Sequence, residues 1–379
     1  MKLRRSILGV VVLAALASAI TLSGVAGPAP ARAGGIASRS YVQTNLVSDI
    51  PGLAAQTDPN LKNPWGTSVG PGSPIWVSDN HAGVTTLYDG AGNAKPLVVA
   101  IPAPPSAGPG AVGAPDGQAF NTFDNNSTDF VISKDGKSGP AFFLFATEDG
   151  TIAGWNPNVD PAHAVIAADR SIATDSVGDV GANYKGLTLV TTPQGKFIYA
   201  TSFRFGKVEV FDNHFNLVNS FTDPTIPAGF APFGIHNING NLYVTFAKQG
   251  ADKGDDDAGP GNGYVDVFSP NGDLLQRLVS RGKLDSPWAV TLAPPTFGTF
   301  GGDILVGNFG NGRIHAYDKT TGAFQGTLSR PDGGPVVIDG LWGVRFAPMT
   351  PGAGPNTAFF TAGINHEADG LFGTLVPNG

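Results

Sequence analysis

A short apolar phrase, often containing an aromatic–Gly pair, recurs along this chain of 379 residues, and each copy is followed by a β-rich stretch. The central positions are 66, 117, 186, 234, 289 and 343, so successive copies lie 48 to 69 residues apart. Self-similarity at such a period is typical of folds built from one repeated supersecondary unit. The copies are Pro64-Trp65-Gly66-Thr67, the degenerate Asp116-Gly117-Gln118-Ala119, Tyr184-Lys185-Gly186-Leu187, Pro232-Phe233-Gly234-Ile235, Pro287-Trp288-Ala289-Val290 and Leu341-Trp342-Gly343-Val344.

Each unit contains a second signature, in which two apolar runs flank a Gly-containing turn. Residues 75–80 and 84–89 are the first example, and residues 304–308 and 313–318 are a later one. The runs are short, β-branched or aromatic, and bounded by Asn, Asp and Gly, as strands paired through tight turns require. In several units a further turn and a polar-flanked strand follow, such as residues 274–279. The pattern therefore predicts four strands per unit.

Six such units predict an all-β fold, a six-bladed β-propeller with four-stranded antiparallel blades. A solenoid is the structural alternative, but its repeats are usually shorter, at about 20–45 residues. The N-terminal strand-like residues 41–47 precede the first unit, and we expect them to complete the last blade and close the ring. We also expect the recurring Trp or Phe to wedge between blades, while the adjacent Gly lets the innermost strands crowd near the axis.

Composition agrees with this architecture. The chain holds 53 Gly and 31 Pro, too many helix breakers for long helices, and its 41% hydrophobic residues argue against disorder. It has no Cys, which excludes disulfides, Cys-ligated metals and a cysteine nucleophile.

The N-terminus has the three parts of a secretory signal peptide. Basic Lys2, Arg4 and Arg5 precede an apolar run over residues 7–22, and Ala31-Arg32-Ala33 supplies small residues for cleavage after Ala33. We therefore predict a signal peptide over 1–33, a flexible segment over 34–40 and a single propeller domain over 41–379. An uncleaved membrane anchor is the alternative. The predicted location is secreted or periplasmic, by a Sec or twin-arginine route that the residues do not resolve.

Net charge bears on the partners. Removing residues 1–33, which hold four basic residues and no acidic one, changes the formal charge from −7 to −11. No basic run remains, so nucleic acid and anionic membranes are poor partners. No later stretch reaches transmembrane length, so we expect no membrane insertion after cleavage, and we expect a monomer.

The repeats also resemble a known family. Residues 77–89 and 305–318 resemble the NHL repeat, and the arrangement is similar to the six-bladed superfamily that includes gluconolactonase-like lactonases. Residues 63–66, 76–80, 308–312 and 340–343 together resemble an uncharacterised family of exported bacterial propeller proteins, some with a C-terminal PEP-CTERM sorting tail. The resemblance covers about residues 41–376 and implies a fold and an export address but no reaction. Residues 375–379 show no such tail, so that sorting route is not expected.

Polar residues gather where the innermost strands should begin and at the turns between second and third strands, which a propeller brings together at the channel mouth. The wider set also includes Glu148, Asp149, Lys185, Asn311, Asn365 and Glu367. Asp and Asn are also the residues that turns prefer, which is the alternative reading. The candidates singled out for ligand binding are Asn63, Asp79, Asn80, His81, Asp116, Asn183, Asp285, Asn308, Asp339 and His366.

Oxygen ligands converging on an axis can bind Ca²⁺, and the candidate metal ligands are Asp116, Asn183 and Asp285. In lactonases of similar shape a metal polarises the substrate carbonyl. The lactonase resemblance implies a Glu near the start of the first inner strand, but Asn63 and Thr67 stand there. The leading hypothesis is therefore an exported protein that binds a small molecule, glycan or protein at the mouth. A Ca²⁺-dependent lactonase or related hydrolase is the alternative, so catalysis stays open.

Three smaller features of the sequence are a pair of histidines, an acidic run and a G-x-S-x-G match. His81 and His366 occupy corresponding turns of the first and sixth units, which ring closure would make neighbours. The acidic run 252–257 could wrap Ca²⁺, but it lacks the EF-hand spacing and reads better as a solvated flexible loop. Residues 66–70 match G-x-S-x-G, but a strand follows where a serine elbow needs a helix.

Overall fold

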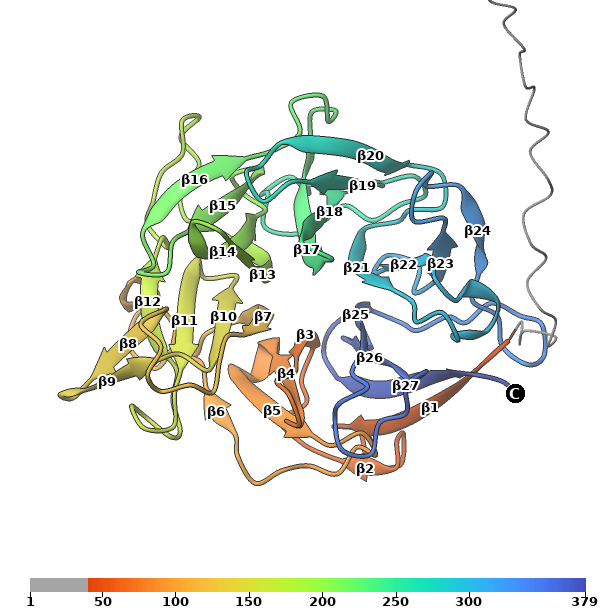
Figure 1. Cartoon of the computed structure of the whole chain (residues 1–379), viewed down its shortest axis with the longest axis horizontal. Coiled ribbons are helices and arrows are strands. Elements are labelled where there is room, and N and C mark those ends of the chain that lie inside the picture. Colours follow the sequence, from red (N-terminus) through yellow and green to blue (C-terminus); the bar gives the residue numbers. More distant parts are fainter. Residues whose placement is uncertain (1–39) are drawn as a thin grey trace, which may run out of the picture. The chain divides into compact units, whose positions relative to one another are not determined.

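The computed structural model describes residues 40–379, which form a ring of six β-sheets around a central axis (Figure 1). This confirms the predicted all-β, six-bladed propeller with four-stranded antiparallel blades. The predicted signal peptide (1–33) and nearly all of the predicted flexible segment (34–40) lie outside the described residues. Within residues 40–379 no helix is long and apolar enough to cross a membrane.

The blades follow the chain in order, and within each the first strand is innermost. Blade 1 contains β3 (Pro64–Ser68), β4 (Ile75–Asp79), β5 (Val84–Tyr88) and β6 (Val99–Ala100), and blade 2 contains β7 (Pro115–Phe120), β10 (Phe143–Thr147), β11 (Thr151–Trp155) and β12 (Val165–Asp169). Blade 3 contains β13 (Tyr184–Thr192), β14 (Gly195–Ser202), β15 (Lys207–Phe211) and β16 (Leu217–Phe221), and blade 4 contains β17 (Phe230–Ile238), β18 (Asn241–Lys248), β19 (Gly263–Phe268) and β20 (Leu274–Ser280). Blade 5 contains β21 (Pro287–Leu292), β22 (Ile304–Asn308), β23 (Ile314–Tyr317) and β24 (Phe324–Thr327).

Blade 6 closes the ring as predicted. It contains β25 (Leu341–Phe346), β26 (Ala358–Ala362) and β27 (Leu371–Pro377), and its fourth strand is β1 (Tyr41–Ser48) from the other end of the propeller. β1 pairs antiparallel with β27, from Tyr41 opposite Pro377 to Ser48 opposite Leu371. The short β2 (Gln56–Thr57) adds a parallel edge to β1, and a small hairpin of β8 (Val131–Lys134) and β9 (Lys137–Pro140) extends blade 2 outward (Figure 1).

The recurring Gly allows neighbouring inner strands to touch, as predicted. A Cβ built on Gly66 would lie 2.3 Å from the carbonyl oxygen of Asp116, and one on Gly234 would lie 2.0 Å from that of Trp288. The pairing register also shifts at the phrase, for example between Pro232 and Ile235, so the phrase marks a β-bulge. Bulge and glycine together bring the inner-strand backbones close to the axis.

The aromatic residues differ from the expectation. Trp65, Phe233, Trp288 and Trp342, from blades 1, 4, 5 and 6, contact one another across the ring instead of each wedging between two blades. The Trp65 ring stacks on Trp342 with centroids 3.3 Å apart, and it meets Trp288 and Phe233 edge-on at 6.0 and 6.4 Å. We call these four residues the aromatic plug. It separates a start face, where the inner strands begin, from an end face, where they finish.

Candidate functional site

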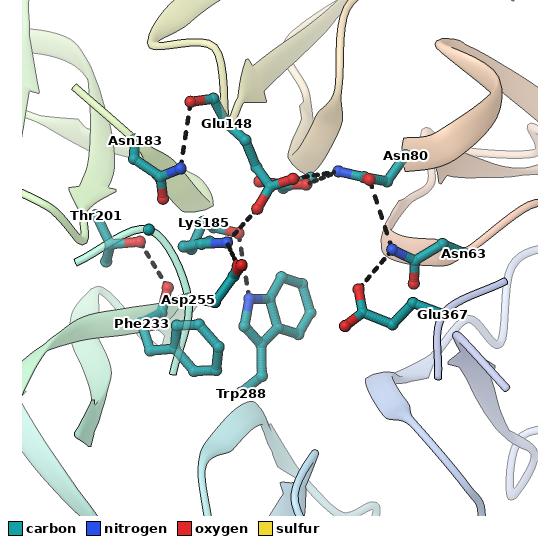
Figure 2. Close-up of polar contacts among 12 residues, drawn as sticks. Asn63, Asn80, Glu148, Asn183, Lys185, Thr201, Phe233, Asp255, Trp288 and Glu367 are labelled. Carbon is teal, nitrogen blue, oxygen red and sulfur yellow. Dashed lines mark hydrogen bonds and ion pairs between the residues drawn. The ribbon is translucent and has the colours of Figure 1, made fainter. Parts of the chain in front are cut away.

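Lys185 is the centre of the polar cluster at the start face. It is the second residue of β13, its side chain is fully buried, and its Nζ lies 5.0 Å from the ring centroid of Trp65 in the aromatic plug. Its ammonium forms an ion pair with Glu148, from the β10–β11 turn, and another at 3.0 Å with Asp255, from the β18–β19 loop (Figure 2). Three different blades therefore supply one ion-pair cluster.

The surroundings of Lys185 keep it charged. Burial alone lowers the pKa of a lysine, but the negative charges of Glu148, Asp116 and Asp255 outweigh that effect and raise the pKa of Lys185 above its ordinary value. The residue is therefore a permanent cation whose charge is already matched by carboxylates.

Asp116 lies beside this cluster in a fully buried position. It is fully buried, and Asn80 Nδ2 donates hydrogen bonds to Asp116 Oδ1 at 2.6 Å and to Glu148 Oε2 at 3.0 Å. Burial, followed by the charge of Glu148, raises the pKa of Asp116 well above its usual value. Asp116 Oδ2 is buried and has no hydrogen-bond partner among the described residues, so a negative charge on this carboxyl would be poorly stabilised.

Asn63 connects this cluster to the aromatic plug and to blade 6. The indole Nε1 of Trp342 donates to Asn63 Oδ1 at 2.9 Å, and Asn63 Nδ2 donates to Glu367 Oε2 at 2.7 Å. The same nitrogen lies 3.5 Å from Asn80 Oδ1 and 3.4 Å from His81 Nε2. Burial raises the pKa of Glu367, and the charge of Glu148 adds to this rise. Figure 2 shows the chain of contacts from Lys185 through Glu148 and Asn80 to Asn63 and Glu367. We call the connected set the mouth network: Asn63, Asn80, Asp116, Glu148, Lys185, Asp255 and Glu367.

Three of the predicted ligand-binding residues, Asn63, Asn80 and Asp116, belong to the mouth network, and two more border it. His81 approaches Asn63, and Asn183 Nδ2 donates to the backbone carbonyl of Glu148 at 3.3 Å.

The other predicted residues have partners of their own. Asp79 accepts a hydrogen bond from Thr86 Oγ1 at 2.8 Å, and Asp285 accepts one from the Gly259 amide at 2.7 Å. Asn308 Nδ2 donates to the Lys283 carbonyl at 2.8 Å, and Asp339 accepts from the Asn365 amide at 3.0 Å. The contacts of Asp285, Asn308 and Asp339 lie in turns and loops, which agrees with the turn preference of Asp and Asn, whereas the contact of Asp79 joins β4 to β5.

The predicted neighbours His81 and His366 share no hydrogen bond among the described residues. His366 is exposed, with φ of 55°, and the next residue, Glu367, turns toward Asn63 instead. Blade 6 therefore contributes a carboxylate to the mouth and not a second imidazole.

The acidic run 252–257 is largely solvated, as predicted, and it also contacts the mouth. Asp252, Asp255 and Asp257 are exposed, while Asp255 pairs with Lys185 and Lys253 Nζ pairs with Asp179 at 2.5 Å. Asp256 is partly buried, and burial raises its pKa to about 6. The loop folds against the mouth because the buried cation of Lys185 attracts it.

A metal site finds no support in this geometry. Among residues 40–379 no group of three or more His, Asp or Glu side chains is placed to hold a metal ion. Asp116, Asn183 and Asp285, the predicted calcium ligands, each engage a different partner. The calcium site stays a prediction.

Comparisons with known proteins find relatives of similar length. The chain is 33% identical over 338 residues to uncharacterized protein R648 of Acanthamoeba polyphaga mimivirus, covering 87% of this chain and 78% of that protein. It is 34% identical over 345 residues to uncharacterized protein L690 of the same virus, covering 87% and 84%. No family model matches the sequence.

Solved structures share the fold at low sequence identity. The soluble aldose sugar dehydrogenase of Escherichia coli has a TM-score of 0.52 at 9% identity, covering 89% of this chain and 100% of that one. A streptogramin B lyase has a TM-score of 0.50 at 14% identity, covering 89% and 97%. Because the identities are so low, these likenesses show the propeller fold alone.

Proposed function

The chain belongs to the protein family that includes R648 and L690, and from this premise we propose that it is a binding protein that holds a small saccharide at the start face. The mouth network and the aromatic surface beside it would form the site. The proposal rests on which hydrogen-bonding groups of the mouth are exposed and which are already paired with other residues.

The open groups are hydrogen-bond acceptors. The side chain of Glu148 is 23% exposed and that of Asp255 is 80% exposed, and Glu367 is partly exposed. The cation is not open, because Lys185 is fully buried and its ammonium is shared by two carboxylates. A ligand at this mouth therefore meets carboxylate oxygens, which bind hydroxyl donors and repel anions.

An aromatic surface is connected to one of these acceptors, Glu367, through Trp342 and Asn63. The Phe309 ring stacks on Trp342 of the aromatic plug with centroids 3.9 Å apart, and it is partly exposed. Trp342 in turn donates a hydrogen bond to Asn63, so the Trp342 ring on which Phe309 stacks is held against the mouth network. Acceptors next to an aromatic face suit a saccharide, which presents hydroxyl groups at its edge and C–H groups on its faces. This combination is the observation that carries the proposal.

Calorimetric titration tests it with a panel of glucose, galactose, mannose, N-acetylglucosamine, cellobiose and maltose. We expect at least one sugar to bind, and we expect Glu148→Gln to weaken that sugar at least about tenfold, since a hydrogen bond to a charged acceptor contributes about 1.5–3 kcal/mol. Asp273→Asn, in an exposed turn of blade 4, is the matched control and should bind normally. No binding across the panel, or equal binding by Glu148→Gln, would refute the proposal, and binding of putrescine but no sugar would show that the ligand class is wrong.

A hydrolase at the same face is the second candidate, and the state of Asp116 favours it. A buried carboxyl with a raised pKa and an unpartnered oxygen is suited to donate a proton to a leaving group. A lactone and ester panel, assayed with added Ca²⁺ and with chelator, tests this function. Turnover that chelation removes would support the Ca²⁺-dependent lactonase, whereas no turnover under either condition would argue against any such hydrolase.

We also propose that the protein acts outside the cytoplasm after cleavage behind Ala33, on the strength of the tripartite N-terminus. Expression of the full chain in a bacterial host, with N-terminal sequencing of the extracytoplasmic product, tests this. A product that begins at Gly34 is expected, and retention of intact protein in the cytoplasm would contradict it.

A further inference from the structure

A separate cavity lies on the axis on the other side of the aromatic plug. Its volume is about 260 Å³, and it is lined by residues of all six inner strands, including Thr67, Thr188, His236, Trp288 and Arg345. A cavity of about 150 Å³ already holds benzene, so this one has room for a small organic molecule. None of the mouth-network residues lines it.

The charge in this cavity is unusual. Among the described residues that line it, Arg345 and His236 are the only ionisable ones, and there is no carboxylate. Arg345 Nε donates to Thr67 Oγ1 at 3.2 Å, and no ion pair with an Asp or Glu is formed by Arg345 within residues 40–379. Lys185 at the start face is matched by carboxylates, whereas the partly buried guanidinium of Arg345 has no carboxylate partner among the described residues.

His236 does not add to the charge. Its Nε2 lies 3.3 Å from the backbone carbonyl of Trp288 and donates to it, which leaves Nδ1 as an acceptor. Burial, and then the positive charge of Arg345, lowers the pKa of His236 to about 4, so the ring is neutral near pH 7. The cavity therefore offers one cation, Arg345, among neutral side chains.

Arg345 is held in position to bind an anion. Thr67 occupies its Nε, which leaves the two terminal nitrogens to face a ligand, and the hydroxyl hydrogen of Thr67 is free to donate as well. The rest of the wall mixes polar side chains with apolar ones, and it includes Gln118, Thr188 and Thr291 beside Phe120, Val290 and Phe346. A guanidinium binds a carboxylate through two parallel hydrogen bonds, and the volume of about 260 Å³ leaves room for the rest of a small organic acid.

We propose that the end-face cavity is a second binding site, which takes a small organic carboxylate with its carboxylate on Arg345 and its body within the cavity. The site is independent of the saccharide site, because the aromatic plug separates them and they share no residue. The ligand classes are also opposite, since one face offers carboxylates and the other offers a cation.

The probe for this site is benzoate, with benzamide as the neutral molecule of the same shape, each titrated calorimetrically into the full-length protein. We expect benzoate to bind one-to-one and at least about tenfold more tightly than benzamide, as a charge-assisted hydrogen bond contributes more than a neutral one. Arg345→Met should remove this preference. Arg330→Met, which removes an exposed arginine beside Asp332, is the matched control and should retain it.

Two further measurements keep the result unambiguous. Thermal unfolding of each variant shows whether it folds. If Arg345→Met does not fold, Thr67→Val replaces it in the test, because it removes the hydroxyl that orients the Arg345 guanidinium and should reduce the preference for benzoate. Glu148→Gln, at the other face, should bind benzoate as the unmodified protein does. The proposal is overturned if benzoate fails to bind at millimolar concentration, or if benzamide binds as tightly as benzoate. It is also overturned if Arg345→Met still binds benzoate more tightly than benzamide.

Discussion

The contact between inner strands makes Gly234→Ala a decisive substitution. The new Cβ would lie 2.0 Å from the carbonyl oxygen of Trp288, whereas ordinary contact begins at 3.4 Å. The inner strands β17 and β21 would have to separate by about 1.4 Å. Trp288 is not free to move, because its ring meets Trp65 and Trp342 in the aromatic plug and its indole nitrogen donates to the Lys185 carbonyl at 3.1 Å.

The expected loss in the free energy of unfolding follows from two opposing effects. Overpacking a rigid core typically costs about 1–3 kcal/mol, and the fixed position of Trp288 places this site at the upper end. Replacing Gly by Ala also restricts the unfolded chain, which offsets about 0.4–1 kcal/mol. The net loss is about 2 kcal/mol, or about thirtyfold in the folding equilibrium.

Urea unfolding followed by tryptophan fluorescence measures this loss as a lower transition midpoint. Gly354→Ala is the matched control, because its new Cβ would meet only the hydroxyl of Thr357, at 3.1 Å, on a side chain that can rotate. We expect the control to stay within about 0.5 kcal/mol of the unmodified protein. If Gly234→Ala behaved like the control, the inner strands would not be as close as the structure has them.

Three more predictions concern protonation, ring closure and the mouth loop. Because the pKa of buried Asp116 is raised above the 3.8 of the unfolded chain, folding binds a proton there and its stability contribution falls as pH rises above 3.8. The stability of Asp116→Asn relative to the unmodified protein should therefore increase from pH 4 to pH 8 in thermal scans. A stability difference that does not change with pH would show that Asp116 is ionised throughout. Val47→Asp, which buries a charge in the apolar cluster that β1 shares with Ile75 and Phe372, should cost about 3–5 kcal/mol in urea unfolding. Val42→Asp, 37% exposed on the same strand, should cost under about 1 kcal/mol, and equal losses would mean that ring closure does not depend on β1. Asp255→Asn should cost under about 1 kcal/mol in the same assay because the side chain is 80% exposed and Lys185 keeps its other partner, and a loss of about 3 kcal/mol would contradict this.

The blades could be predicted because their signals are local. Strand residues, tight turns and the Gly of each phrase lie within a few residues of one another, and repetition in six units made each signal stronger. Ring closure followed from the leftover strand over residues 41–47, since a propeller whose first and last strands do not pair leaves an open edge. The aromatic plug could not be derived in the same way, because the direction of each ring depends on the bulge geometry near the axis.

The mouth network was only partly predictable because its contacts are long-range. Asn63 and Glu367 are 304 residues apart, and Lys185 and Asp255 are 70 apart. One signal was present in the sequence. Lys185 is a charged residue directly before the recurring Gly, whereas four of the other five copies of the phrase contain no charged residue. A lysine buried in an inner strand needs carboxylates nearby, and the acidic run 252–257 was a group of carboxylates with no assigned role.

The secreted bacterial origin suggested by the resemblance stays a prediction, while the comparisons place the chain in a family with mimivirus proteins. The low-identity structural likenesses do not choose between binding and catalysis. That choice depends on the start face itself.

The central claim is that this protein binds a saccharide at the mouth network. A crystal structure of the protein soaked with the sugar that binds most tightly in the panel tests it most directly. The claim predicts sugar density against Glu148 and Asp255, with one sugar face on the Phe309 ring. Sugar density confined to the outer strands or to the end-face cavity, with the mouth network unchanged, would contradict it.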